Sequence, residues 1–341
     1  MAKDKRSGMP LSQRWVKRAD RHITPSIQHL HITLPSRTIH LPLYRLYIIF
    51  TLASNSFSHN IEHLHHQTPS LTLHNTTTTT KPLPSPPPNT PTMSTTTSPK
   101  KAILFLGATG GCGLSALRRS LEAGHTCIAL CRTPSKLSSK LPASLLPNLK
   151  LEQGNAHDVS AVARCLVHPN DPSRVVDMVV TSIGGAFSLK TGLDDVNVCG
   201  KGANALVEAL ASVRKSGNVS GQPWLVGVSS TGLTDAGRDI PLLLVPLYHG
   251  LLKVPHKDKK AMEDILANSG ERFTIVRAAW LTDGPEKGGI RVGVEDVAAG
   301  KFEKKEIGWS ISREDVGRWI FEHLVEGREE KYAGKAVGIS Y

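Results

Sequence analysis

The stretch AILFLGATGGCGL occupies residues 102–114 and combines three local patterns in one short segment. Its first five residues form a continuous apolar run, which is typical of a strand buried on both faces of a parallel sheet. Four glycines follow within a turn, and Leu114, Leu117 and Leu121 then recur at helical spacing. The segment therefore predicts a strand, a tight glycine turn and a helix in direct succession.

Strand and helix patterns alternate from this segment to the C-terminal part of the chain. Short apolar runs predict further strands at 126–130, 149–151, 178–181, 224–228 and 273–276. Helical patterns lie between them at 159–166, 200–213 and 262–266. Ser312, three residues before Asp315, resembles a capping box ahead of a last helix. Repeated β–α units with short links predict one α/β domain, a Rossmann-type doubly wound parallel sheet with helices on both faces.

The glycine turn has the spacing and placement of a loop that cradles phosphates. Gly107 permits a sharp turn out of the strand, and Gly113 allows the helix to pack closely against it. Gly110 and Gly111 let the backbone approach a pyrophosphate, which the unpaired N–H groups and the dipole of the helix N-terminus favour. Because the turn follows the first strand and opens the first helix, it predicts a nucleotide site. The candidate residues are Gly107, Thr109, Gly110, Gly111, Cys112 and Gly113.

The end of the second predicted strand indicates which nucleotide is bound. A site for NAD carries an Asp or Glu about 20 residues after the glycines, where it binds the ribose 2′-hydroxyl. The segment 127–140 has no acidic residue, and Arg132 stands at the expected position with Lys136 nearby. Cations at this place suit a 2′-phosphate, so we expect NADP (NADPH) as the cofactor.

Residues 1–92 differ in composition from the remainder of the chain. They contain one of the 29 glycines and end in a threonine- and proline-rich tract at 75–88. Such a tract cannot bury enough apolar surface to offset its chain entropy. We therefore expect a disordered, dispensable low-complexity extension, followed by a domain that spans residues 93–341. His63, His65 and His66 lie in this extension, and we expect no metal site.

The charge distribution, the apolar runs and the cysteines indicate which cellular compartment and which binding partners are to be expected. The net charge is +12, but residues 1–92 hold 10 Lys/Arg against 3 Asp/Glu, so the predicted domain is only mildly basic. No base-reading or aromatic-stacking motif accompanies the basic residues, so nucleic acid is not expected as a partner. The apolar run 41–53 is too short to span a bilayer, and the five cysteines lack paired spacing. We expect a cytoplasmic protein, with mitochondrial import through the basic start as the alternative.

The glycine loop and the segments around it resemble the short-chain dehydrogenase/reductase superfamily. More narrowly, they resemble its atypical NAD(P)-binding branch, which includes the NmrA-like and biliverdin-reductase-B-like proteins. The resemblance covers about residues 101–341, and the GATGGCG loop carries most of it. It implies that Asn155 lies near the adenine, where the family usually has Asp. It also implies that the loop of Ser182, Ile183 and Gly184 passes the cofactor riboses.

The superfamily's catalytic signature, a serine followed by Tyr-x-x-x-Lys, is only partly present. In that signature the tyrosine exchanges a proton, the lysine lowers its pKa and holds the nicotinamide ribose, and the serine orients the carbonyl. Ser230 follows the fifth predicted strand and takes the place of the serine. Tyr248 has no lysine four residues later, whereas His256 and Lys260 have that spacing. We align His256 with the tyrosine and Lys260 with the lysine, and we assign Lys257 and Lys259 to the solvated face of the helix; the alternative is that His256 is a surface histidine on a basic helix.

The resemblance implies an enzyme that transfers a hydride from NADPH to a small carbonyl, quinone or flavin-like substrate. Solvent can supply the proton for flavin-like or quinone-like acceptors, so loss of the tyrosine need not abolish activity. Phe187, Tyr248 and Trp280 could line an apolar substrate pocket, although aromatic residues beside a sheet more often belong to the core. The alternative is a non-catalytic NADP-binding sensor of NmrA-like type that acts through a protein partner. The missing Tyr-x-x-x-Lys and the exchange at Asn155 favour that alternative.

Overall fold

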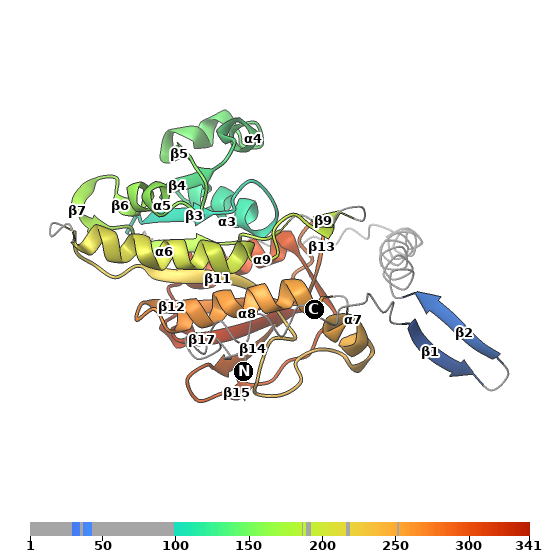
Figure 1. Cartoon of the computed structure of the whole chain (residues 1–341). Coiled ribbons are helices and arrows are strands. Elements are labelled where there is room, and N and C mark those ends of the chain that lie inside the picture. The colour runs from blue at the N-terminus through green and yellow to red at the C-terminus, as the bar shows by residue number, and fades with distance from the viewer. Residues whose placement is uncertain are drawn as a thin grey trace, which may run out of the picture. The chain divides into compact units, whose positions relative to one another are not determined.

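The computed structural model describes residues 29–34, 37–42, 99–185, 187–188, 192–215, 219–250 and 252–341. The chain divides into two compact units, Met1–Pro87 and Pro88–Tyr341. In the first unit, β1 (His29–Leu34) pairs antiparallel with β2 (Arg37–Pro42) as a hairpin, which the sequence analysis did not predict (Figure 1). The tract 75–88, the three histidines and the boundary expected after residue 92 lie outside the described residues, so the boundary stays a prediction.

The second unit is built on a nine-stranded sheet with the order β15-β14-β17-β12-β11-β8-β3-β4-β5 (Figure 1). The strands from β5 to β17 in this order run parallel, whereas β14 pairs antiparallel with both β17 and β15. Their bounds are β3 (Ala102–Leu106), β4 (Thr126–Cys131), β5 (Leu149–Gln153), β8 (Met178–Thr181), β11 (Trp224–Ser230), β12 (Arg272–Ala278), β14 (Arg291–Asp296), β15 (Lys301–Lys304) and β17 (Lys335–Ser340).

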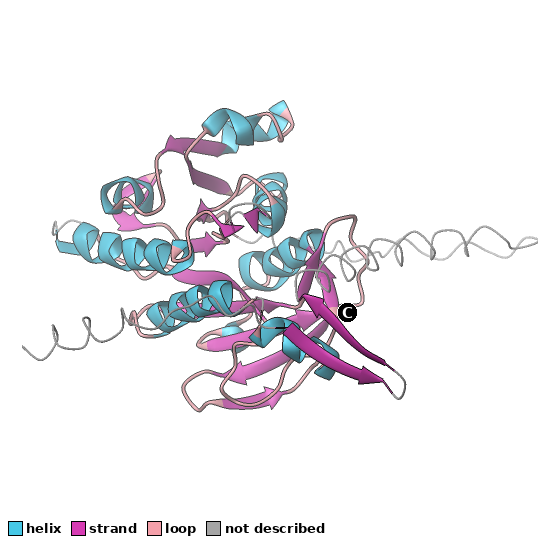
Figure 2. Ribbon diagram, turned by 45° about the vertical axis from the view of Figure 1, so that its right-hand side comes forward, coloured by secondary structure: helices cyan, strands magenta, loops and turns pink. Residues whose placement is uncertain are grey.

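Helices cover both faces of this sheet (Figure 2). One face packs against α3 (Gly111–Glu122), α9 (Arg313–Trp319) and the π-helical segment Ile320–Glu326 that continues α9. The other face packs against α5 (Val159–Leu166), α6 (Val198–Lys215) and α8 (Lys253–Ala267). None of the helices in the described ranges is long and apolar enough to cross a membrane.

Shorter elements connect these layers. Their bounds are α4 (Pro134–Ser138), α7 (Val245–His249), the 3₁₀ turns Ala143–Asn148, Leu242–Leu244 and Glu330–Tyr332, and the paired strands β6 (Val167–His168) with β7 (Asp171–Val175), β9 (Phe187–Ser188) with β10 (Gly192–Leu193), and β13 (Trp280–Thr282) with β16 (Ser310–Ser312). Ile240, Leu244 and Tyr248 form a separate small apolar cluster, against which other side chains of α7 and Trp280 pack.

The central strand β3 shows why the apolar runs become interior strands. All five of its side chains are buried, and they alternate between the two faces of the sheet. Ile103 and Phe105 join the core beneath α3 and α9, while Leu104 and Leu106 join the core beneath α5 and α6. The predicted Rossmann-type fold is therefore confirmed. The six predicted strands are β3, β4, β5, β8, β11 and β12, while β14, β15 and β17 were not predicted.

The strand order places the glycine turn at a functional position. The chain passes from β3 to β4 on one side, whereas β8 pairs with β3 on the other side. The carboxyl end of β3 is thus the point at which the strand order reverses. In open α/β sheets, ligands bind in the crevice at such a switch point.

Candidate functional site

Two glycines of the loop are required by the packing of the protein itself. Gly107 has φ +89°, and a Cβ atom there would lie 2.8 Å from the carbonyl carbon of Ser182. A Cβ atom on Gly113 would lie 2.2 Å from the Oγ atom of Ser182. That hydroxyl donates a hydrogen bond to the carbonyl of Gly107 at 3.1 Å. Gly107 and Gly113 therefore let the end of β8 close against the glycine turn.

Gly110 is not required by packing. Its φ of −177° is open to any residue, and the one atom found within 4 Å of a Cβ there is Nζ of Lys140, at 3.9 Å. Gly110 also gives α3 no side-chain cap, and α3 has no acidic residue in its first turn. Free N–H groups and an open approach are what a phosphate group needs at a helix N-terminus. This part of the structure fits the pyrophosphate of a dinucleotide.

A cleft of about 340 Å³ opens next to this loop, over the carboxyl ends of β8, β11 and β12. Among the described residues that line it none is acidic, and the two cationic ones are Lys259 and Arg313. Seven of the predicted site residues line it, namely Gly110, Gly111, Cys112, Ser182, Ile183, Gly184 and Ser230. The structure thus brings together half of the predicted glycine-loop residues, the loop after β8 and the serine at the end of β11.

Other predicted cofactor residues lie beyond the cleft, at the ends of β4 and β5. Arg132 and Lys136 are exposed, and no hydrogen bond or ion pair of either side chain is found among the described residues. Asn155 is exposed and accepts a hydrogen bond from the backbone N–H of His157. A further cation, Lys140, donates to the carbonyl of Thr109 at 2.6 Å, a contact that no local sequence pattern indicates.

The structure corrects the choice of lysine on α8. Nζ of Lys259 donates to the carbonyls of Ile183 and Val228, at 2.9 and 2.7 Å, and Lys259 lines the cleft. Nζ of Lys260 instead contacts the carboxylates of Asp264 and Asp235, at 2.5 and 3.6 Å, and Lys260 does not line the cleft. The lysine in the candidate site is therefore Lys259, which the sequence analysis assigned to the solvated face.

The rotation of α8 explains this one-residue difference. The buried carboxylate of Asp258 accepts hydrogen bonds from the backbone N–H groups of Cys199 and Gly200, both at 2.8 Å. These N–H groups belong to the first turn of α6, where they lack partners within the helix. Asp258 therefore holds α8 against α6, and this orientation directs Lys259, rather than Lys260, toward the ends of the strands.

Ser230 and His256 lie close to one another. Their Oγ and Nε2 atoms lie 3.4 Å apart, and the imidazole packs edge-on against the ring of Tyr248, with centroids 5.1 Å apart. Burial, with a smaller contribution from His249, lowers the pKa of His256 to about 4. The imidazole is therefore neutral at neutral pH. Proton donation in place of the tyrosine would need the imidazolium, which is scarce there, so these contacts favour a positioning role for His256.

Tyr248 lines the cleft, although the sequence analysis did not align it with the catalytic tyrosine because no lysine lies four residues after it. It comes from α7, is 3% exposed and lines the cleft together with Trp280. Burial raises the pKa of its phenol, so the hydroxyl stays protonated at neutral pH. Ser229 also lines the cleft, and its buried Oγ has no hydrogen-bond partner among the described residues. The side chain of Phe187 lies outside the described residues.

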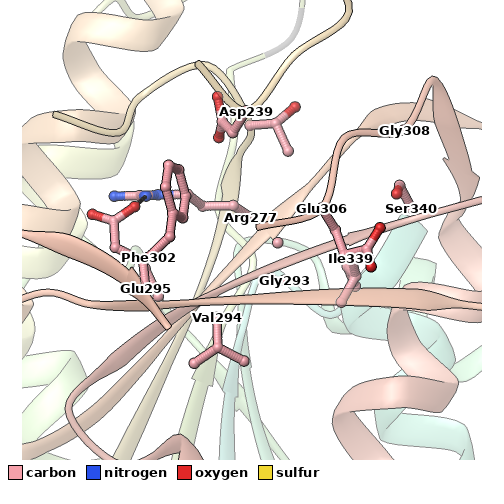
Figure 3. A pocket seen from close by; sticks show the side chains of 13 residues that line it. Asp239, Arg277, Gly293, Val294, Glu295, Phe302, Glu306, Gly308, Ile339 and Ser340 are labelled. Atoms are coloured by element: carbon pink, nitrogen blue, oxygen red, sulfur yellow. Dashed lines mark hydrogen bonds and ion pairs between the residues drawn. The ribbon is translucent and has the colours of Figure 1, made fainter. Parts of the chain in front are cut away.

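A second, much smaller cavity is lined by side chains of β12, β14, β15 and β17 (Figure 3). Its volume of about 20 Å³ has room for about one water molecule, so it cannot hold a substrate. Arg277 lines it and forms buried ion pairs with Glu263 at 2.7 Å and Glu295 at 2.6 Å. These pairs join β12, α8 and β14 beneath the cleft, and we assign this cavity to the structural support of the site. Within the described residues, no group of three His, Cys, Asp or Glu side chains is placed to hold a metal ion.

A doubly wound sheet with a glycine loop at its switch point, and a cleft whose described lining holds no acidic residue, are features of a dinucleotide-binding protein. The comparisons with known proteins agree. A family model described as NAD(P)H-binding matches residues 107–326, from the glycine loop to the end of the π-helical segment. The chain belongs to this NAD(P)H-binding family of oxidoreductases. The predicted resemblance to an NAD(P)-binding family is thereby confirmed.

Curated relatives and a solved structure give the same picture. The reductase pytE of Aspergillus terreus is 40% identical over 269 residues, which cover 72% of this chain and 99% of the relative. The oxidase pynE of Aspergillus niger is 33% identical over 262 residues, covering 66% and 93%. A short-chain dehydrogenase/reductase from Veillonella parvula, solved in complex with NADP, is 19% identical with a TM-score of 0.53. That match covers 71% of this chain and 94% of the other, and it shows a shared fold.

Proposed function

We propose that this protein is an NADPH-dependent reductase of a small carbonyl, quinone or flavin-like substrate. The observation that carries the proposal is the cleft of about 340 Å³, which joins the glycine loop to Ser230, Tyr248 and Lys259. NADPH, when bound, supplies the hydride for such a reaction. The relatives named reductase and oxidase support redox chemistry of this kind.

The glycine loop and the loop after β8 are the proposed cofactor platform. Gly110 and Gly111 leave the N-terminus of α3 open to the phosphates, and Ser182 holds the loop in place through the carbonyl of Gly107. Lys259 is the proposed contact to the nicotinamide ribose, because its ammonium lies at the ends of both β8 and β11. This proposal moves the role expected of Lys260 to the preceding residue.

Ser230 and Tyr248 are the proposed groups that act on the substrate. The Ser230 hydroxyl lines the cleft and can donate its single proton to a substrate oxygen, while the neutral imidazole of His256, as its Nε2–H tautomer, donates to the Ser230 Oγ atom and sets its direction. Tyr248 retains its proton at neutral pH and is the proposed proton donor in the cleft. The hydride and this proton together complete a two-electron reduction of a carbonyl or quinone.

NADP is the proposed form of the dinucleotide. Arg132 and Lys136 follow β4, where the ribose 2′ position is bound in this fold, and both side chains are exposed and available. Lys140 adds a third positive charge next to the glycine loop. A small-molecule substrate in the cytoplasm is the partner that this proposal requires.

The test is NADPH consumption by the purified chain with a panel of quinones, flavins and aldehydes, repeated with NADH. We expect turnover with at least one acceptor class and a preference for NADPH that Arg132→Glu weakens roughly ten- to a hundredfold. Tyr248→Phe and Ser230→Ala should each lower kcat roughly 10²–10⁴-fold while the Kd for NADPH stays unchanged. Tight NADPH binding without turnover on any acceptor would contradict the reductase proposal and favour a sensor.

A further inference from the structure

An arginine from a distant part of the chain lies over the glycine loop. Arg313, the first residue of α9, lines the cleft, and its Cδ atom is 3.4 Å from where a Cβ on Gly111 would lie. Its Nη1 atom donates to Oδ1 of Asp283 at 2.8 Å. The guanidinium therefore sits between the N-terminus of α3 and one carboxylate at the outer edge of the cleft.

The ion pair between Arg313 and Asp283 is easily exchanged. The Arg313 side chain is 36% exposed and that of Asp283 is 91% exposed, so water screens the pair. Arg277 is a contrasting case, because its two ion pairs with Glu263 and Glu295 are almost fully buried. A ligand anion that enters the cleft can replace Asp283 on Arg313 at little cost, whereas no anion can reach Arg277 in this way.

The electrostatic surroundings of Arg313 favour an anion on the cleft side. None of the described residues that line the cleft is acidic, and Lys259, the other cation among them, faces the same region. Burial raises the pKa of the Cys112 thiol to about 11, and Arg313 and Lys259 are the two charges that act most strongly in the opposite direction. Both cations thus act on the first turn of α3, where the N–H groups add to the positive potential.

We propose that Arg313 is an oxyanion clamp, which exchanges Asp283 for an anionic group bound at the glycine loop. The inference rests on the proposed function, because the phosphates of NADPH are the oxyanions expected at this loop. An anionic group of the substrate has the same chemistry and is the other possible source. Asp283 acts in this scheme as a competing counter-ion, which occupies the guanidinium when no ligand is bound.

The clamp predicts opposite effects for the two members of one ion pair. Arg313→Ala should raise the Kd for NADPH roughly ten- to a hundredfold, because a charge-assisted contact is lost. Asp283→Asn should lower the Kd by roughly two- to fivefold, because the competing carboxylate is removed. Arg313→Lys should lie between the wild type and Arg313→Ala, since an ammonium cannot bind two oxygens in the planar geometry of a guanidinium.

The measurement is NADPH binding by fluorescence titration, together with steady-state kinetics for any accepted substrate. Arg174→Ala is the matched control, because Arg174 forms a partly exposed ion pair with Asp177 away from the cleft, and its Kd should equal that of the wild type. A change confined to the KM of the substrate assigns the clamped oxyanion to the substrate rather than to the cofactor. No change in either constant, or equal weakening by Arg313→Ala and Asp283→Asn, would overturn the clamp.

Failure of the proposed function has a separate signature. If the wild-type chain bound no NADPH, the reductase proposal would fail while the clamp could still be tested with inorganic pyrophosphate. The same order of affinities would then be expected in thermal-shift titrations, with Asp283→Asn tightest and Arg313→Ala weakest. Equal pyrophosphate affinities for all variants would overturn the clamp as well.

Discussion

The Oγ atom of Ser230 lies 3.4 Å from Nε2 of His256, so the end of β11 is joined to α8 by a serine–imidazole contact. Burial lowers the pKa of His256 to about 4, and the Nε2–H tautomer of the neutral imidazole can donate to the Ser230 Oγ atom. The single proton of the Ser230 hydroxyl then points away from His256, and the carbonyl of Thr231 accepts it at 3.1 Å. The contact therefore favours His256 as a positioning residue for Ser230.

The first prediction concerns the dependence of kcat on pH, and in particular its fall at acid pH. Between roughly pH 5 and 8 His256 stays neutral, so its titration should cause no change in kcat over that range. As the pH falls toward 4, protonation should place a positive charge on the partly buried imidazole, disturb its contact with Ser230 and lower kcat. His256→Ala should lower kcat over the whole range and lose this acid limb, with the Kd for NADPH unchanged. A limb near pH 6.5 in the wild type that is absent from His256→Ala would contradict the assignment.

Stability gives an independent check of the same pKa. The folded state binds the His256 proton more weakly than the unfolded state, whose imidazole titrates near pH 6.5. The free energy of unfolding should therefore fall, on the order of 3 kcal/mol, as the pH drops from about 6.5 to about 4. His256→Gln should show a smaller fall over this window in urea unfolding. Equal pH dependence of the two proteins would show that His256 is not buried as described.

The second prediction compares two adjacent lysines of α8. Lys259→Ala removes the donor to the carbonyls of Ile183 and Val228 at the cleft, so we expect weaker NADPH binding and lower stability. Lys260→Ala removes only partly exposed ion pairs with Asp264 and Asp235, so we expect a change within about 0.5 kcal/mol and normal binding. Titration of both variants with NADPH, beside their melting temperatures, makes the comparison. The reverse order of effects would restore Lys260 as the site lysine.

The third prediction separates a ligand requirement from a packing requirement within the glycine loop. Gly110→Ala places its Cβ in open space with an allowed φ, so the melting temperature should be nearly unchanged while NADPH binding is lost. Gly113→Ala places its Cβ 2.2 Å from the Ser182 hydroxyl, so it should destabilise the fold itself by about 1–3 kcal/mol. Normal NADPH affinity in Gly110→Ala would mean that no phosphate approaches this part of the backbone.

The sequence predicted the elements whose signal is local and missed those whose signal is weak. The five interior side chains of β3 form an unbroken apolar run because both faces of that strand are buried. By contrast, β14 reads RVGVED and β15 reads KFEK, at an edge of the sheet where most side chains remain partly or fully exposed. Such strands need no continuous apolar pattern, since the ladder of backbone hydrogen bonds defines them.

The residues of the candidate site also fall into those with a local sequence signal and those that only the tertiary packing brings together. The glycine loop was predictable because its residues are consecutive and their roles follow from one turn. Lys259 could not be chosen over Lys260 from spacing alone, because the Asp258 contact with α6 sets the rotation of the helix. Arg313 lies about 200 residues after Gly111 in the sequence, and only the packing of α9 against α3 brings them together.

The five cysteines are all buried as free thiols, so the rate at which a thiol reagent labels each one can report local opening of the structure around it. Burial raises the pKa of each thiol, so a thiol reagent can react only after the surrounding structure has opened. Cys112 lies in the first turn of α3 at the glycine loop, whereas Cys127 is fully buried in β4. Labelling of Cys112 therefore times the local opening of the nucleotide loop, and labelling of Cys127 times the unfolding of the sheet. The wild-type protein therefore allows the opening of the glycine loop and the unfolding of the sheet to be measured separately, through the labelling rates of two of its own cysteines.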